Sequence, residues 1–301
     1  MAKSNRDDSQ DRLEVLKTYK IYIGGKFPRT ESGRYYSPKI DGKSLGNICL
    51  ASRKDVRNAV VAARGAQPSW WAKTACNRGQ ILYRIAEMLE GRAEQFVSEL
   101  TSQGLSAEAA KTEVVQSIDR LIYYAGWCDK YQQIFSAVNP VASSHFNFSV
   151  LEPTGVVFAV ASEESPLLGL ISLLAPIIAG GNSCVVLASE SKPLSAITLS
   201  EVLATSDVPG GVVNLLTGSK SELVEHFSRH LDVNAIALDS NDQGMLTAIQ
   251  EFAVENVKRV KQYSKDWSSE DSESPYLIHD FCEVKTTWHP IEAISATGSG
   301  Y

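Results

Sequence analysis

The segment that decides the fold runs from residue 155 to residue 263 and opens with GVVFAVA (Gly155–Ala161). A short continuous apolar run of this kind is typical of a strand buried on both faces. Similar runs recur in alternation with helical patterns: we expect strands at residues 155–161, 183–187, 212–216, 235–238 and 257–263, separated by helices at residues 167–179, 194–205, 221–229 and 244–255. This alternation predicts an α/β fold, a doubly wound, Rossmann-like parallel sheet with right-handed crossovers.

The segment before this sheet has the period of helices. From Ser52, a predicted N-cap, apolar residues recur at helical spacing to Tyr131. We expect an N-terminal helical layer that carries no obvious chemistry. Two β elements flank it, a hairpin around the Gly-Gly pair in residues 20–26 and an exposed, alternating strand at residues 143–152.

The chain changes character after Tyr263. Residues 264–275 (SKDWSSEDSESP) are acidic and serine-rich, which predicts a solvated linker. Residues 276–288 have β-type residues and predict a strand that has no sheet of its own. The predicted division is a disordered or frayed lead-in (1–18), one domain (19–263) that includes a hairpin at about 136–153, the linker (264–275), and a terminal strand with a small-residue tail (276–301).

Composition and charge narrow the class of protein. The chain is 44% hydrophobic and 21% charged, as soluble globular proteins are. Its net charge of −6 argues against a nucleic-acid partner, because phosphate neutralisation needs a basic surface. The most apolar stretch, residues 166–181, is shorter than the roughly 20 residues of a bilayer span, so we expect no membrane insertion.

Cysteine and histidine usage points to a reducing compartment without a metal site. The five cysteines are scattered and show no metal-binding spacing, so we expect free thiols, and with no signal peptide evident, a cytoplasmic protein. His226 and His230 lie four residues apart, but no third ligand follows nearby. We interpret them as part of a solvated helix face.

Several segments together resemble the aldehyde dehydrogenase family. The matching stretches occur in the family's order and are YIGGKFPRTESGRYY, DVRNAVVAARGAQPSWW, EPTGVVFAVASEESPLL, AGGNSCVVLASESKPLSA, VPGGVVNLLTG and FCEVKTTW. The resemblance covers about residues 19–263 and again residues 281–288. It implies that residues 19–263 are the family's coenzyme-binding domain and that the last strand serves oligomerisation.

The family's catalytic positions are not kept. Its oxyanion-stabilising Asn falls on Glu164, whose carboxylate would repel a developing negative charge, and the preceding Trp falls on Glu163. The general-base Glu falls on Tyr263. The family's second lobe with its catalytic Cys does not follow, and Cys282, within the oligomerisation-like strand, has no base or oxyanion donor beside it.

The coenzyme-binding positions are only partly kept. Glu190, Gly218 and Ser240 match, so the resemblance implies a vestigial NAD or NADP site there. The Lys that helps to hold the adenosine ribose falls on Leu187, and Lys220 replaces the second glycine of a Gly-x-Gly turn. Asp239 and Asp242 flank a helix N-terminus that would otherwise attract the pyrophosphate.

These departures predict a pseudoenzyme. The pattern is similar to the catalytically inactive second copy of family-16 aldehyde dehydrogenases and implies a structural or regulatory subunit without bound cofactor. The resemblance places oligomerisation contacts at Phe146, Phe148, Phe281, Val284 and Trp288. We expect strand exchange with a full-length aldehyde dehydrogenase or another aldehyde-handling enzyme, or a homo-oligomer. Two alternatives stay open, an NAD(P)-binding module without turnover and a weak aldehyde dehydrogenase.

Overall fold

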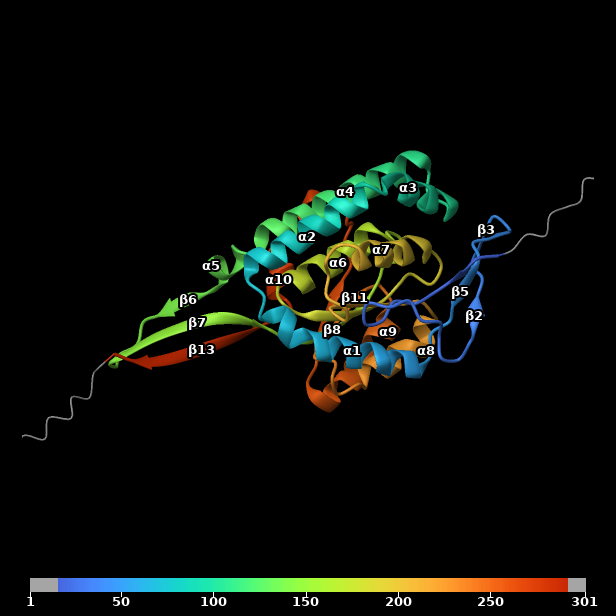
Figure 1. Cartoon of the computed structure of the whole chain (residues 1–301). Coiled ribbons are helices and arrows are strands. Elements are labelled where there is room, and N and C mark those ends of the chain that lie inside the picture. The colour runs from blue at the N-terminus through green and yellow to red at the C-terminus, as the bar shows by residue number, and fades with distance from the viewer. Residues whose placement is uncertain (1–15, 292–301) are drawn as a thin grey trace, which may run out of the picture.

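The computed structural model describes residues 16–291, and a five-stranded parallel sheet lies at its centre (Figure 1). The order of the strands across the sheet is β10-β9-β8-β11-β12. Their bounds are Val156–Val160 (β8), Ser183–Leu187 (β9), Val213–Leu216 (β10), Ala235–Asp239 (β11) and Arg259–Tyr263 (β12). Numbered along the chain, this is the order 3-2-1-4-5 of a doubly wound sheet, so the predicted fold class is confirmed.

Helices cover both faces of this sheet, which explains why its strands are continuously apolar. The crossover helices are α6 (Leu168–Ala179), α7 (Leu194–Ala204), α8 (Lys220–Ser228) and α9 (Gln243–Ala253). In β8, Val157 and Ala159 pack into the cluster that contains α6, whereas Val156, Phe158 and Val160 pack into the cluster that contains α8. Helix α1 (Arg53–Trp71) lies on the α8 face.

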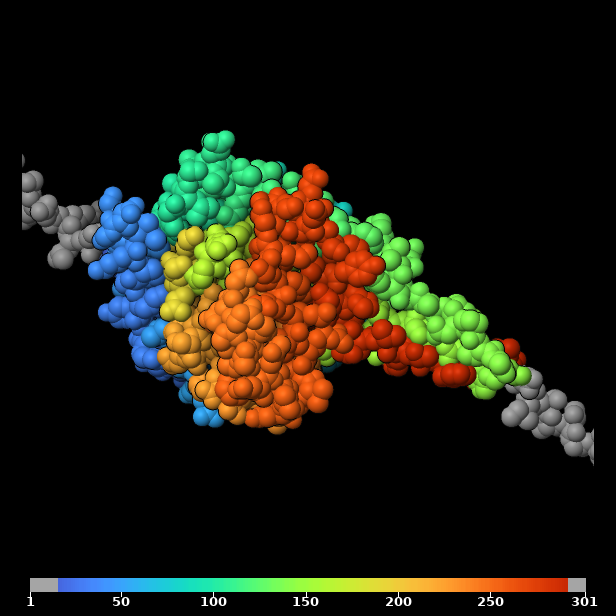
Figure 2. Space-filling model, turned by 180° about the vertical axis from the view of Figure 1, so that it is seen from behind, coloured from blue at the N-terminus to red at the C-terminus, as the bar shows by residue number. Residues whose placement is uncertain are grey.

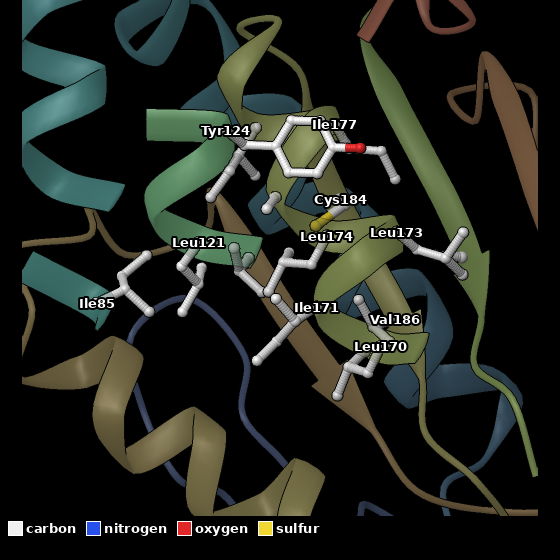
Figure 3. Packing of buried hydrophobic residues seen from close by; sticks show 14 of the residues in the cluster. Ile85, Leu121, Tyr124, Leu170, Ile171, Leu173, Leu174, Ile177, Cys184 and Val186 are labelled. Atoms are coloured by element: carbon white, nitrogen blue, oxygen red, sulfur yellow. The ribbon is translucent and has the colours of Figure 1, made fainter. Parts of the chain in front are cut away.

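An outer helical layer lies over α6, as the sequence predicts. Its helices are α2 (Ala75–Glu90), α3 (Ala93–Ser102), α4 (Ala107–Trp127) and α5 (Tyr131–Phe135). Figure 3 shows Ile85, Leu121 and Tyr124 of this layer beside the α6 side chains. Every residue of α6 is buried, because the helix lies between the sheet and α4. No helix within residues 16–291 has the length and apolarity needed to cross a bilayer.

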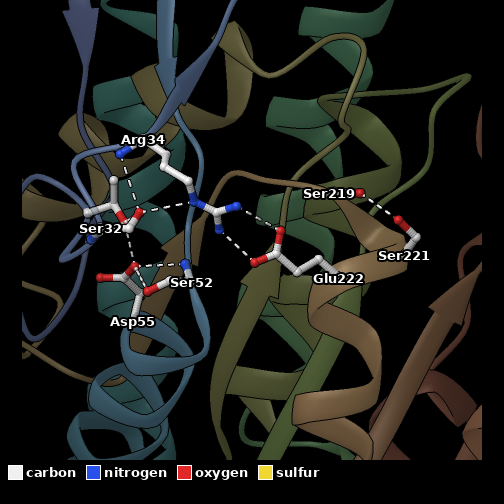
Figure 4. Close-up of polar contacts among 8 residues, drawn as sticks. Ser32, Arg34, Ser52, Asp55, Ser219, Ser221 and Glu222 are labelled. Carbon is white, nitrogen blue, oxygen red and sulfur yellow. Dashed lines mark hydrogen bonds and ion pairs between the residues drawn. The ribbon is translucent and has the colours of Figure 1, made fainter.

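Short N-terminal strands pack beside the main sheet. Their bounds are Thr18–Tyr19 (β1), Tyr35–Tyr36 (β2), Lys39–Ile40 (β3), Lys43–Ser44 (β4) and Asn47–Cys49 (β5). Arg34, next to β2, binds the carboxylate of Glu222 in α8 with N–O distances of 2.6 and 3.2 Å (Figure 4). Asp55 in the first turn of α1 accepts hydrogen bonds from the Ser52 backbone N–H and from the Thr30 hydroxyl. Of the predicted lead-in, residues 1–15 lie outside the described residues.

Residues 264–275, here called the strap, are not the solvated linker that their composition predicts. Trp267 is 2% exposed, and a 3-10 helix (η2) spans Glu270–Ser272. The buried guanidinium of Arg120 in α4 donates to the Trp267 carbonyl oxygen at 3.0 Å and to the Glu273 carboxylate at 3.1 Å. One tryptophan and one long-range arginine therefore dock a segment that is otherwise polar.

The prediction of a terminal strand without its own sheet is also wrong. Residues 276–279 form a short helix, α10 (Tyr276–His279), and the strand β13 (Cys282–Pro290) follows. It pairs antiparallel along the whole of β7 (His145–Pro153), and β7 also pairs with β6 (Ala137–Asn139). These three strands, here called the arm, project from the body of the molecule (Figures 1 and 2). The expected tail at residues 295–301 lies outside the described residues.

Candidate functional site

A pocket of about 620 Å³ lies at the carboxyl edge of the main sheet. It is lined by residues that follow β8, β11 and β12, and the strap forms one side of it. The chain order reverses between β8 and β11, and ligands of doubly wound sheets bind at such a switch point. This pocket is therefore the candidate functional site.

An internal ion pair crosses this edge. The ammonium group of Lys220, at the start of α8, lies 2.6 Å from the carboxylate of Glu163, which follows β8, and donates to the Ala161 carbonyl oxygen at 3.0 Å. Glu163 also accepts hydrogen bonds from the backbone N–H groups of Glu190 and Ser191 at 2.8 and 3.1 Å. Burial disfavours its ionised form, but hydrogen bonds from Lys220 and two serine hydroxyls outweigh burial and lower the pKa of Glu163 to about 2.

The N-terminus of α6 is bound by a carboxylate from the outer helical layer. Glu113 of α4 is 8% exposed, and its Oε1 accepts from the backbone N–H groups of Leu167 and Leu168 at 2.9 and 3.1 Å. The first N–H groups of a helix have no partner within the helix and carry a partial positive charge. Glu113 supplies the anion that these donors require.

The other helices that start at this edge are capped in the same way. The Leu194 N–H of α7 donates to the side-chain oxygen of Gln103, the Lys220 N–H of α8 to Glu190, and the Met245 N–H of α9 to Asp242, at 2.7, 3.0 and 2.9 Å. Three carboxylates and one amide of the chain itself thus bind the first turns of four helices. Helix N-termini are the usual phosphate sites of such folds.

Asp239 at the end of β11 is a buried carboxylate in the pocket. It is 8% exposed, and the indole N–H of Trp267 in the strap donates to it at 2.6 Å. Burial raises the pKa of Asp239 to about 6, and the negative charge of Glu164 adds to that shift, while Trp267 and Lys220 oppose it. The strap therefore docks on a group that titrates near neutral pH.

Glu164 and Tyr263 stand at the positions that match the family's oxyanion donor and general base. Glu164 is exposed, and its backbone N–H donates to the Ser162 hydroxyl. The Tyr263 hydroxyl donates to the Asp280 carboxylate at 2.9 Å. Burial raises the pKa of Tyr263, and Asp280 raises it further, so this phenol stays protonated.

The three matching coenzyme residues all have internal roles. Glu190 accepts from the start of α8, and the Ser240 hydroxyl accepts from the Asp242 N–H at 3.1 Å. At Gly218 an added Cβ would lie 3.0 Å from Leu223 and 3.2 Å from the Ala51 backbone N, so a side chain there would require these neighbours to shift. Ser240 lines the pocket with Lys220.

The helical layer contributes side chains that its sequence did not reveal. No chemistry was expected of residues 53–131, whereas Glu113, Gln103 and Arg120 all reach the carboxyl edge or the strap. Glu163 and Lys220 were expected to be separate departures from the family pattern. Their opposite charges, at two positions expected at one sheet edge, were the available signal of an ion pair.

No cysteine lines the pocket. Cys128, Cys184 and Cys282 are buried, and burial raises the thiol pKa to about 12 in Cys128 and Cys282. Cys76 is exposed, but it lies on α2 in the outer helical layer. Within residues 16–291, no group of three His, Cys, Asp or Glu side chains is arranged to hold a metal ion.

The sheet order and the pocket at its switch point define a protein with a Rossmann-like fold of the dinucleotide-binding class. The sequence profile of the aldehyde dehydrogenase family matches residues 28–262. The chain belongs to the aldehyde dehydrogenase family, as the six sequence segments predict.

Its relatives are longer proteins. The chain is 32% identical over 280 residues to the cytosolic 10-formyltetrahydrofolate dehydrogenase of Mus musculus, covering 91% of this chain and 30% of that protein. It is 30% identical to the putative aldehyde dehydrogenase DhaS of Bacillus subtilis, covering 83% of this chain and 51% of that protein. The chain therefore spans about half or less of the length of these relatives.

Solved aldehyde dehydrogenase structures share the fold. The NAD⁺ complex of aldehyde dehydrogenase from Bacillus cereus superposes with a TM-score of 0.78 at 25% identity, covering 82% of this chain and 50% of that one. PnpE in complex with nicotinamide adenine dinucleotide superposes with a TM-score of 0.76 at 29% identity, covering 81% of this chain and 50% of that one. These neighbours bind NAD. In the present chain Glu113, Glu190 and Asp242 bind the starts of α6, α8 and α9, and Asp239 also precedes α9.

The cap on α6 gives a stability prediction. Glu113→Ala leaves two buried N–H groups without an acceptor, and we expect it to lower the free energy of unfolding by about 1–3 kcal/mol. Glu113→Gln keeps an acceptor oxygen, so its free energy of unfolding should fall clearly less than that of Glu113→Ala. Urea denaturation of both variants measures the difference. Equal losses in the two variants, or no loss in Glu113→Ala, would show that the cap does not stabilise α6.

Asp239 gives a pH prediction. Its pKa is raised from 3.8 to about 6 by folding, so the folded chain binds the proton more tightly and stability rises as the pH falls through this window. Between pH 7 and pH 4.5 the gain from this group is about 2 kcal/mol. Asp239→Asn should lack this gain in stability at low pH. Asp119→Asn, which changes an exposed residue on α4, should keep the gain. Urea denaturation measures the free energy of unfolding at each pH. If it changes with pH in the same way in the wild type and in Asp239→Asn, the gain in stability does not come from Asp239.

Proposed function

We propose that this chain is a non-catalytic member of the aldehyde dehydrogenase family, which acts as a structural or regulatory subunit through its arm. The carboxyl edge supports the first part. Its helix starts are bound by Glu113, Glu190, Asp242 and Gln103, no cysteine lines the pocket, and Glu164 and Tyr263 stand at the positions of the family's oxyanion donor and general base. We infer that the chain holds no dinucleotide and turns over no aldehyde. The free thiols of its five cysteines favour the cytoplasm as its compartment.

The exposed edge of the arm supports the proposed role as a subunit that binds a partner. β13 is an edge strand, and within the described part of the chain no strand pairs with its outer side. Unpaired strand edges are templates for pairing with a second chain. The arm extends away from the body (Figure 1), so this edge is sterically open to a partner.

Apolar side chains on the arm support it further. Phe146, Val284 and Trp288 are 46%, 59% and 57% exposed, and Val138 of β6 is 66% exposed. A shallow groove of about 320 Å³ runs over β6 and β7 between Val138, Phe146 and Phe148. Exposed apolar patches of this kind mark protein interaction sites.

Phe281 differs from the other predicted contact residues. It is 1% exposed and packs in the main core cluster, and its carbonyl oxygen accepts hydrogen bonds from Asn182 and Thr154. It anchors the start of β13 to the body and offers no surface to a partner. Phe146, Phe148, Val284 and Trp288 remain the predicted contacts.

We propose a full-length aldehyde dehydrogenase as the partner. Strand addition needs a second sheet with a free edge. Within the described residues the main sheet ends at the five-residue strand β12, which is shorter than the nine-residue β13. A catalytic relative would supply such a sheet together with the active site that this pocket lacks. A homodimer through the arm is the competing outcome.

Co-purification from native cells tests this proposal. Tagged wild-type chain should elute as a particle larger than the monomer that contains an aldehyde dehydrogenase, and the purified chain alone should reduce no NAD with aldehyde. Phe146→Asp with Val284→Asp should abolish the complex, because each change puts a charge on the apolar arm. Val115→Asp, which changes a 56% exposed residue on α4, is the matched control and should leave it intact. A stable monomer, a homodimer, or aldehyde-dependent NAD reduction by the chain alone would overturn it.

A further inference from the structure

A second hollow lies on the face of the molecule that carries α1 and α8. Its volume is about 830 Å³, and it runs between the first two turns of α1 and the C-terminal end of α8. The two helices lie side by side in Figure 1. It shares no lining residue with the pocket at the carboxyl edge.

The lining of this groove is cationic in a chain whose net charge is −6. Arg53, Lys54 and Arg57 come from α1, and His226, Arg229 and His230 come from the end of α8. Glu225 is the acidic side chain of the lining. Such a local reversal of sign concentrates anions at one place on the surface.

Two of these cations have no internal counter-ion. Lys54 pairs with Glu31, and Arg229 pairs with Glu225 and Glu255. Arg53 and Arg57 form no ion pair or side-chain hydrogen bond with any residue in 16–291. They are four residues apart on α1 and therefore lie on one face of the helix.

The nearby carboxylates are held by other groups. Asp55, between the two arginines, accepts hydrogen bonds from Ser52 and Thr30, and Glu222 of α8 is bound by Arg34 (Figure 4). These contacts hold both acids away from the groove. Two guanidinium charges consequently remain uncompensated beside it.

The opposite wall adds a donor and apolar surface. The Nδ1 atom of His230 accepts a hydrogen bond from the Asp232 N–H at 3.2 Å, which leaves Nε2–H as the donor of the neutral ring. Leu231 is 70% exposed at the rim, whereas Val56 of α1 lies beneath the groove and is buried. Pockets of 300–1,000 Å³ with a few polar groups and apolar walls are typical of small-molecule sites.

We propose that this groove binds a small ligand through a dianionic phosphate group held by Arg53 and Arg57. Two uncompensated positive charges match the charge of a phosphate, and the planar guanidinium group bonds phosphate oxygens in pairs. Arg229 and the His230 Nε2–H lie across the groove as further donors, and the exposed Leu231 offers apolar surface to the organic part of the ligand. The site is independent of the arm and of the carboxyl edge.

Calorimetric titration of the full chain with sodium pyrophosphate at low ionic strength tests this proposal. We expect saturable binding of one ligand per chain. Arg57→Gln removes a pair of charge-assisted bonds and should weaken binding about tenfold or more. Arg57→Lys keeps the positive charge but cannot form the paired hydrogen bonds. Its affinity for pyrophosphate should lie between the affinities of the wild type and of Arg57→Gln. Both arginines are exposed, so these variants should fold normally, which their melting temperatures check.

Arg84→Gln is the matched control, because Arg84 is 42% exposed on α2 in the outer helical layer and the change in net charge is the same. It should alter the affinity less than twofold. The absence of saturable heat, or an equal effect of Arg84→Gln and Arg57→Gln, would overturn the site. Phenyl phosphate in a parallel titration tests the organic part of the ligand: tighter binding than pyrophosphate supports a phosphorylated organic compound, and weaker binding contradicts it.

Discussion

The structure at the carboxyl edge depends on one constraint, that the free N–H groups at helix starts need anionic or polar acceptors. In this chain the acceptors are its own side chains. The Lys220–Glu163 pair, with an N–O distance of 2.6 Å, links the start of α8 to the loop after β8, and the Glu163 carboxylate also binds the N–H groups of the 189–191 loop. A helix start whose N–H groups bind an internal acid in this way is no longer free to bind a ligand phosphate.

The same edge also carries the path of the chain to the arm. From β12 the strap crosses the pocket, held by Trp267 on Asp239 and by Arg120, and α10 then returns the chain to the base of β7. Arg259 of β12 donates to the carbonyl oxygens of Asp280 and Cys282 and so fixes the point where β13 begins. The pocket and the projecting arm are therefore joined by one continuous set of contacts.

Much of the fold follows from local sequence. The runs at Gly155–Ala161 and Ser183–Leu187 are continuously apolar because helices cover both faces of the sheet, and the sequence predicts those strands within a residue or two. The strap is different, since its composition is that of a solvated segment. Its order comes from Trp267 and from Arg120, which lies 147 residues away along the chain. A contact between residues so far apart in the sequence cannot be predicted from the composition of the segment.

The candidate site, like the fold, is predicted only in part from the sequence. The departures at Glu163, Glu164, Lys220 and Tyr263 are visible against the family pattern, but their partners are tertiary. Glu113 reaches α6 from a helix whose sequence shows only an apolar stripe, and Asp280 reaches Tyr263 from beyond the strap. Sequence comparison can show that a catalytic group is replaced. The contacts of the replacement become visible only in the fold.

Titration with NAD is the most direct measurement of whether the carboxyl edge is closed. It is best made on the chain with Arg53→Gln and Arg57→Gln, so that the separate cationic groove contributes no heat. We expect only the heat of dilution at millimolar NAD, because internal side chains already bind the helix starts. Saturable, submillimolar binding of one NAD per chain would contradict the account.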